Sequence, residues 1–303
     1  MNFDLSVLWE NIAELFKDGG WKMPVMWIIG GVLIFLAIKK EMEPTLLLPM
    51  GFGAILVNLP NSGAREVIDH LFDIGINSHE LFPLILFIGI GAMIDFEPLL
   101  TNPKLMLFGA AAQFGIFFTL CAASLIGFDI KDAASIAIIG AADGPTAIVV
   151  AQTLGSKYTS AIMVAAYSYM SLVPIIQPPI MNALTTKAER AIKMPPLREV
   201  KKIEKICFPL IVLLLCAILL PSAVPLIGAL MLGNLAKEVG PSVGRIADTM
   251  SNALINIVTI MLGLSVGSKL ACEKFLSGQT LAILALGLCA FCVGTAGGVL
   301  MAK

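Results

Sequence analysis

Apolar runs close to membrane-spanning length recur along the whole chain, each bounded by charged residues, Pro or Gly. This pattern predicts helical spans at residues 25–38, 45–59, 81–96, 105–127, 133–155, 158–183, 206–220, 222–236, 251–268 and 279–302. Several of these spans are too short for a straight crossing and contain internal Gly or Pro. Such interruptions predict half-helices or re-entrant segments, which occur inside a protein or beside a water-filled cavity.

Two segments outside the spans differ from them in character. Residues 1–24 hold acidic residues and, at helical spacing among them, a set of apolar side chains. The apolar side chains are Leu5, Leu8, Trp9, Ile12, Leu15 and Phe16. This spacing predicts an amphipathic helix that lies on the membrane or against a neighbouring subunit. Residues 186–205 hold seven Lys or Arg against three Glu, and the positive-inside rule therefore predicts a basic cytoplasmic loop.

Two stretches of the chain resemble each other. The segments "LPMGFGAILVNLP" around Pro49 and "VPLIGALMLGNLAK" around Pro225 align without gaps, and Asn58 and Asn234 each follow the proline by nine residues. About forty residues further on, "LFIGIGAM" in the first half resembles "IMLGLSVG" in the second. Membrane transport proteins are often built from such internal repeats, so a repeated architecture is expected here.

The alignment predicts a first membrane repeat over residues 25–185, with a helix broken at Asp143, and an incomplete second repeat over residues 206–303. By the same spacing, the counterpart of Asp143 would fall near position 317, beyond Lys303. Either the repeat is incomplete by nature or the sequence is a fragment.

Composition restricts the class of protein further. Of the 303 residues, 58% are apolar and only 14% are charged, whereas soluble domains are about half apolar and a quarter charged. The net charge of −1 says nothing about nucleic-acid binding, but the sequence has no basic stripe with interleaved aromatic residues, so no nucleic-acid partner is expected. The sequence therefore predicts an all-α, polytopic membrane protein: a helical bundle with internal repeats and broken or re-entrant helices.

One carboxylate interrupts the most suggestive of these spans. Asp143 is the only charged residue between positions 133 and 155, where a carboxylate costs roughly 2.5–3.5 kcal/mol in a membrane helix. The Gly-Pro pair after it removes an amide donor and predicts an unwound turn. Freed carbonyls such as that of Gly140, the Thr146 hydroxyl and the carboxylate would form a Na⁺ or H⁺ site. The alternative is a protonated Asp that serves packing alone.

The following span, "YSYMSLVPIIQPPIM", contains Tyr167 and Tyr169. Tyr at membrane depth is often an ordinary interfacial residue. Here Pro174, Pro178 and Pro179 are expected to break the helix, which favours a cavity wall instead. Four asparagines in apolar surroundings are expected to form hydrogen bonds between helices, namely Asn58, Asn234, Asn252 and Asn256.

Together with "LLPMGFGAILVNLP", the motifs "GAADGPTAIV" and "YSYMSLVPIIQPPIM" resemble the β subunit of the sodium-pumping biotin-dependent decarboxylases of oxaloacetate, methylmalonyl-CoA and glutaconyl-CoA. The resemblance covers nearly the whole chain. It implies a multi-pass subunit in a bacterial or archaeal inner membrane that decarboxylates carboxybiotin and exports Na⁺. It further implies that Asp143 binds the ion and exchanges a proton, and that Tyr169, with Tyr167 close by, handles a proton during decarboxylation.

The same resemblance implies partners: a biotin carrier protein, a soluble carboxyltransferase subunit, a small membrane subunit and further copies of this chain. The family's second broken-helix signature, rich in Asn, Gly and Ser with an Arg, lies outside these 303 residues, so the second half of the ion site is not assigned. On physical grounds alone, a Na⁺-coupled symporter or Na⁺/H⁺ antiporter competes with this interpretation. A non-catalytic anchor is a weaker alternative, because it leaves Asp143 without a purpose.

Overall fold

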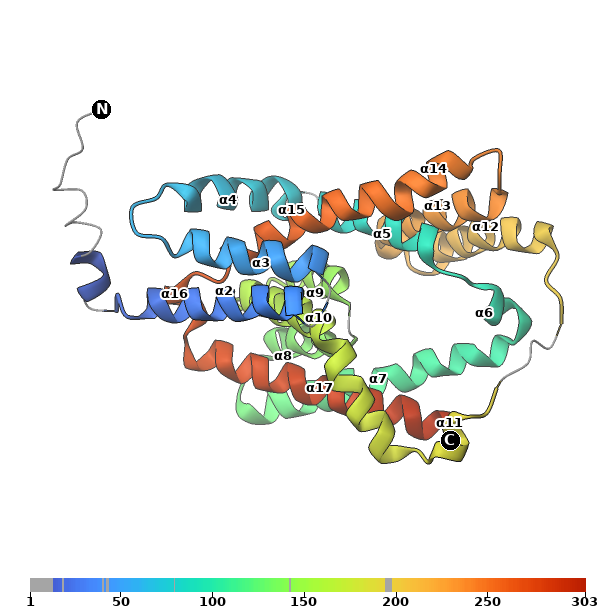
Figure 1. Cartoon of the computed structure of the whole chain (residues 1–303). Coiled ribbons are helices and arrows are strands. Elements are labelled where there is room, and N and C mark those ends of the chain that lie inside the picture. Colours follow the sequence, from blue (N-terminus) through green and yellow to red (C-terminus); the bar gives the residue numbers. More distant parts are fainter. Residues whose placement is uncertain are drawn as a thin grey trace. The chain divides into compact units, whose positions relative to one another are not determined.

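The apolar runs fold into helices. The computed structural model describes residues 13–17, 19–39, 41, 44–78, 80–141, 143–193 and 198–303, and every regular element in these ranges is helical (Figure 1). This confirms the all-α prediction. The chain divides into two compact units, and each is built from separate parts of the sequence.

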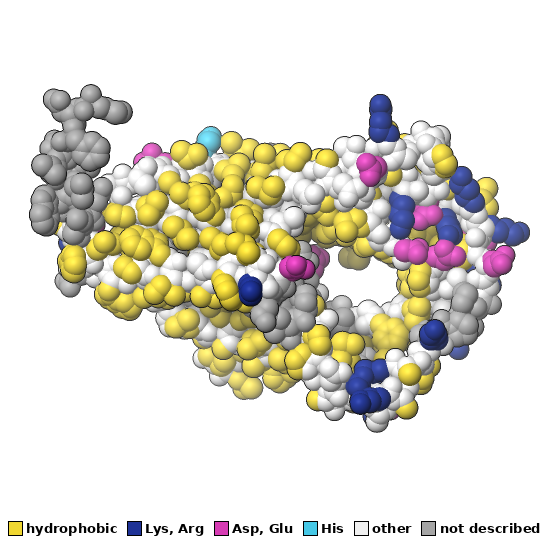
Figure 2. Space-filling model, in the orientation of Figure 1, with side chains coloured by type: hydrophobic (Ala, Val, Ile, Leu, Met, Phe, Trp, Pro, Cys, Tyr) yellow, Lys and Arg dark blue, Asp and Glu magenta, His cyan; other side chains and the backbone are white. Residues whose placement is uncertain are grey.

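Four helical stretches of the described chain are long and apolar enough to cross a membrane, namely Lys22–Lys39, Pro103–Ile126, Gly244–Ser268 and Gly278–Ala302. A bent pair, Ala64–Asn77 with Leu81–Met93, would make a fifth. Large apolar side chains stay exposed on these helices, for example Phe35 at 57% and Leu125 at 88%. Figure 2 shows such side chains covering α2 (Lys22–Lys39) and α3 (Pro44–Val57). A surface of this kind suits contact with lipid and confirms a multi-pass membrane protein.

Unit 1 comprises residues 1–73, 111–185 and 262–303. Its helices are α2 (Lys22–Lys39), α3 (Pro44–Val57), α4 (Ala64–Phe72), most of α7 (Leu107–Ile126), α8 (Ile130–Ala137), the 3₁₀ turn η3 (Ile138–Ala141), α9 (Gly144–Thr153), α10 (Thr159–Leu184), the end of α15 (Ile255–Ser268), α16 (Cys272–Phe275) and α17 (Gly278–Ala302). Helices α2 and α3 pack as one pair, and α10 packs along α17.

Unit 2 comprises residues 74–110 and 186–261. Its elements are α5 (Leu81–Met93), α6 (Glu97–Thr101), η2 (Pro103–Met106), α11 (Lys187–Arg190), α12 (Lys202–Leu219), η4 (Pro221–Ala223), α13 (Val224–Val239), α14 (Gly244–Asp248), η5 (Thr249–Leu254) and the start of α15; the π-turn η1 (Asp73–Asn77) begins at the boundary. Helix α13 packs between α5 and α12. Lys and Arg gather with Asp and Glu over α12 and α13 (Figure 2).

The two asparagines that align in the sequence make similar contacts. In unit 1, Asn58 follows α3 and donates its amide to the Leu270 carbonyl, just beyond α15, at 2.9 Å. In unit 2, Asn234 of α13 donates to the Ile94 carbonyl, just beyond α5, at 3.3 Å. Both are the predicted interhelical hydrogen bonds. Asn252 differs, because its amide donates to Asp248 four residues earlier in the same helical segment.

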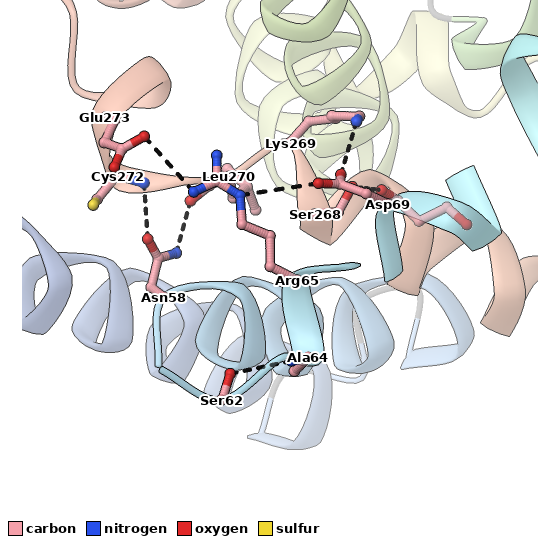
Figure 3. A network of polar contacts seen from close by, with 11 residues as sticks. Asn58, Ser62, Ala64, Arg65, Asp69, Ser268, Lys269, Leu270, Cys272 and Glu273 are labelled. Carbon is pink, nitrogen blue, oxygen red and sulfur yellow. Dashed lines mark hydrogen bonds and ion pairs between the residues drawn. The ribbon is translucent and has the colours of Figure 1, made fainter. Parts of the chain in front are cut away.

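A polar network ties α3 and α4 to the link between α15 and α16 (Figure 3). Asn58 is buried, and its Oδ1 accepts from the Cys272 backbone N–H at 2.8 Å. Lys269 donates to Asp69 at 3.0 Å and lies 3.8 Å from the centre of the Phe72 ring. Arg65 of α4 lies 3.7 Å from Glu273. The link is therefore held at several points by one helical pair.

One local expectation is wrong. Pro174, Pro178 and Pro179 do not break the span that contains them, because α10 runs without interruption from Thr159 to Leu184. A membrane helix tolerates Pro where neighbouring groups satisfy the carbonyls that lose their donors. Residues 1–12 of the predicted amphipathic helix lie outside the described residues. That helix, the repeats and the basic cytoplasmic loop stay predictions.

Candidate functional site

Asp143 lies at the tip of a helical hairpin whose two ends meet. Helix α8 leads into η3, the chain turns at Asp143 with φ −128° and ψ 104°, and α9 runs back. At the open end, Asp132 accepts hydrogen bonds from the Ser156 hydroxyl at 2.8 Å and the Lys157 backbone N–H at 3.1 Å. The predicted span 133–155 is therefore a helical hairpin with its two ends together, which is the geometry expected of a re-entrant segment.

The hairpin is about half as long as the hydrocarbon core of a bilayer is thick. Helix α9 has ten residues and is about 15 Å long, half of the roughly 30 Å hydrocarbon thickness. The tip contacts the middle of its neighbours: Gly140 lies against Gly115 of α7, and Gly144 lies under Tyr167 of α10. A hairpin of this length that enters from one membrane face would bring its carboxylate to the depth where transporters bind their ions.

The Gly-Pro pair starts a helix as well as ending one. Pro145 occupies the first turn of α9, where its missing N–H would have no partner within the helix. Asp143 takes the preceding cap position, and its carboxylate accepts a hydrogen bond from the Thr146 hydroxyl. The positive end of the α9 dipole also favours a negative charge there. Sequence and local structure together fix the carboxylate at a helix N-terminus.

Glycines allow the tip to fit between its neighbours. A Cβ added at Gly140 would lie 2.9 Å from the Gly115 carbonyl carbon, and one added at Gly115 would lie 2.6 Å from the Ala290 carbonyl oxygen of α17. A Cβ at Gly144 would lie 2.6 Å from Cε1 of Tyr167. Since real Cβ atoms are not found this close to other heavy atoms, each of these contacts requires glycine.

The two predicted tyrosines face different partners. Tyr167 is completely buried, and its ring covers Gly144 beside Asp143. Tyr169 donates its hydroxyl to the Leu284 carbonyl of α17, and its ring centre lies 5.6 Å from that of Phe291. The structure therefore brings Asp143, Thr146 and Tyr167 together, and it places Tyr169 in the contact between α10 and α17.

The oxygen atoms at the tip are suitable ligands for a small alkali cation. One carboxylate and one hydroxyl lie within hydrogen-bonding distance, beside a 3₁₀ turn whose backbone carbonyls are not committed to a regular α-helix. Hard cations prefer such oxygen ligands. In the described part of the chain, no three His, Cys, Asp or Glu side chains are grouped in a way that would hold a transition metal.

Sequence reasoning missed Asp132. Its side chain is only 6% exposed, and it borders a cavity of about 420 Å³ that Asp129, Lys157 and Gln279 also line. Asp132 stands one residue before the apolar run, where it looks like an ordinary charged flank. The signal that distinguishes it is its contact with Ser156, 24 residues away, which a local pattern does not contain.

Residues 22–303 match the family model described as the Na⁺-transporting oxaloacetate decarboxylase beta subunit. The chain belongs to this family. It is 48% identical to the probable oxaloacetate decarboxylase beta chain of Vibrio cholerae, over 97% of this chain and 84% of that one. It is 51% identical to the methylmalonyl-CoA decarboxylase subunit beta of Veillonella parvula and 50% identical to the glutaconyl-CoA decarboxylase subunit beta of Acidaminococcus fermentans. Each match covers 96% of this chain and 79% of the relative.

Membership settles several expectations. The protein is a decarboxylase β subunit, the multi-pass bacterial membrane subunit of a Na⁺-transporting enzyme with partner subunits. A secondary transporter is not favoured. The three relatives are named for three different acids, so relatedness alone does not select the acid for this β subunit.

Proposed function

We propose that this β subunit decarboxylates carboxybiotin and uses Asp143 to couple that reaction to Na⁺ export and proton uptake. The observation that carries the proposal is the grouping of Asp143, Thr146 and Tyr167 at the tip of the hairpin. Carboxybiotin is the substrate, and a biotin carrier protein presents it. A soluble carboxyltransferase subunit, a small membrane subunit and further copies of this chain complete the assembly.

The coupling follows from proton balance. When the N–C bond of carboxybiotin breaks and CO₂ leaves, the ureido nitrogen must gain one proton. Asp143 holds either Na⁺ or H⁺: Na⁺ leaves outward, a proton replaces it, and that proton is later consumed at biotin. Tyr167 covers the carboxylate and excludes water from it. Tyr169, which faces α17 from another side of α10, is the second candidate for proton handling. Thr146 and the backbone at Gly140 supply neutral oxygens to the cation.

The hairpin geometry supports an outward direction of release. Helix α10 starts at the open end of the hairpin, and its 26 residues extend about 39 Å to the start of the basic segment 186–205. The positive-inside rule places that segment in the cytoplasm. The open end then lies at the extracytoplasmic face, with Asp143 reached from there along the hairpin.

The test is Asp143→Asn in the complete complex reconstituted into vesicles. We expect Na⁺-stimulated decarboxylation and uptake of radioactive Na⁺ to fall by a factor of about 10² or more, as for loss of a proton-transferring side chain. Asp129→Asn, an exposed carboxylate at the open end of the same hairpin, is the control and should retain both activities. Na⁺-stimulated turnover that survives in Asp143→Asn would refute the role of this carboxylate.

A further inference from the structure

The two ends of the hairpin are joined by one buried carboxylate. Asp132, in the first turn of α8, accepts from the Ser156 hydroxyl and the Lys157 N–H, both beyond the end of α9. Ser156 is itself buried, and its Oγ accepts from the Tyr158 N–H at 3.2 Å. Beside them, the rings of Phe128 and Tyr158 meet edge to face with centres 5.5 Å apart. These contacts close the open end of the hairpin.

We propose that Asp132 is a positioning residue: its clasp on Ser156 and Lys157 holds the hairpin closed and thereby keeps Asp143 in place beneath Tyr167. The proposal rests on the proposed function, because it assigns Asp132 a task toward the ion site at the tip. Asp132 touches neither the ion nor carboxybiotin and acts only through the hairpin.

Because Asp132 is buried, it is not an ordinary solvated surface charge. A carboxylate that is only 6% exposed is costly unless hydrogen bonds compensate it. The α8 dipole favours an acidic side chain in the first turn, but it favours the exposed Asp129 at the cap position equally. What sets Asp132 apart is that its hydrogen-bond donors, Ser156 and Lys157, lie 24 and 25 residues later, across the hairpin.

The clasp reaches the tip through two short helices. Helix α8 has eight residues and α9 has ten, and both are too short to be stable alone. They are joined at the tip by η3 and the turn at Asp143, and at the open end by the clasp. If the clasp opens, the helices pivot about the tip, and the oxygens of Asp143 and of η3 lose their mutual geometry. Cation affinity depends on that geometry to within fractions of an ångström.

The test measures decarboxylation by the complete complex as a function of Na⁺ concentration. Asp132→Ala removes both acceptor bonds, and we expect the KM for Na⁺ to rise about tenfold while kcat falls much less, a change equivalent to one or two buried hydrogen bonds. Asp132→Asn keeps a side-chain oxygen that accepts the same bonds and should restore the KM to within about twofold. Loss of folded protein alone would lower total activity without moving the KM.

The matched control is Asp129→Ala, which removes a carboxylate from the same cavity but leaves the clasp intact. Its KM for Na⁺ should stay unchanged; an equal rise there would show that surface charge, not the clasp, is responsible, and would overturn the proposal. An unchanged KM in Asp132→Ala would also overturn the proposal, as would a failure of Asp132→Asn to restore the KM.

If Asp132→Ala does not assemble, Ser156→Ala is the second variant. It removes one donor and should raise the KM for Na⁺ about threefold. An unchanged KM in Ser156→Ala would count against the clasp. None of these outcomes alters the Asp143→Asn result, so the two proposals fail separately.

Discussion

Because Gly144 has no side chain, the Tyr167 ring can pack close to the backbone beside Asp143. Tyr167 is completely buried, and the space that a Cβ would need at Gly144 is filled by its ring. The ring therefore packs directly on the backbone beside Asp143.

We predict that Gly144→Ala displaces the Tyr167 ring and impairs the site. Overpacking of this kind costs about 1–3 kcal/mol, and Na⁺-stimulated decarboxylation should fall at least about tenfold in the assembled complex. Gly298→Ala in α17 is the control, because a Cβ there meets nothing within 4 Å. Full activity in Gly144→Ala would show that the ring position is irrelevant to turnover.

The reactivity of the Cys272 thiol can be used to probe the link between α15 and α16. Its backbone N–H is bound by Asn58, and burial raises the pKa of its thiol above the ordinary value. A raised pKa leaves less thiolate at a given pH, and only the thiolate reacts with alkylating reagents.

We therefore predict that Cys272 reacts slowly near pH 8 and that its rate reaches half of its maximum at a higher pH than that of an exposed thiol, whose midpoint lies at about 8.5. Mass spectrometry of the purified subunit after timed alkylation measures this. Asn58→Ala frees the link and should shift the profile back toward lower pH. A Cys272 profile that coincides with that of a free thiol such as N-acetylcysteine would contradict a buried thiol.

Within each unit, some helices pack so closely that only glycine fits at the contact. In unit 2, a Cβ added at Gly91 of α5 would lie 1.9 Å from the Leu230 carbonyl oxygen of α13, and one at Gly233 would lie 2.0 Å from that of Ile88. Backbone atoms do not yield as a flexible side chain does. The distance between α5 and α13 is therefore set by the absence of side chains at these points.

Gly91→Ala should accordingly destabilise the protein by about 3 kcal/mol or more, seen as a lower melting temperature in detergent and a smaller yield of assembled complex. Gly109→Ala is matched to it in chemistry, but a Cβ there meets nothing within 4 Å, so stability should not fall. Equal losses in the two variants would mean that helix contact is not the cause.

The element boundaries show what a sequence can and cannot predict. Asp143 was predictable as a break, because a lone carboxylate and a Gly-Pro pair are local signals. Whether the broken span crosses or returns was left open, since this depends on Asp132 meeting Ser156 far along the chain. Tyr167 and Tyr169 were grouped because they are close in sequence. Two residues along a helix, however, turn the side chain by about 200°, so the two rings face different helices.

The whole molecule should respond to its cargo ion. A ligand that binds only the folded state stabilises it by RT ln(1 + [L]/Kd), or about 2.7 kcal/mol at a hundredfold excess over Kd. We predict that Na⁺ raises the melting temperature of the wild-type subunit in detergent, whereas choline at the same ionic strength does not. In Asp143→Asn the Na⁺ and choline curves should coincide. A Na⁺ effect of undiminished size in that variant would place the ion elsewhere.

Because the hairpin returns to the face it left, it also governs how the rest of the chain is threaded during synthesis. The end of α7 and the start of α10 line one cavity, so α10 departs from the face at which α7 arrives. Had the 23 residues from Ala133 to Gly155 been inserted as one crossing, every later span would be inverted and the basic segment would emerge on the opposite face. A carboxylate in the middle of that run opposes such misthreading by roughly 2.5–3.5 kcal/mol. An apolar replacement such as Asp143→Leu would therefore remove an ion ligand and weaken a topological safeguard at once, whereas Asp143→Asn stays polar and isolates the first effect.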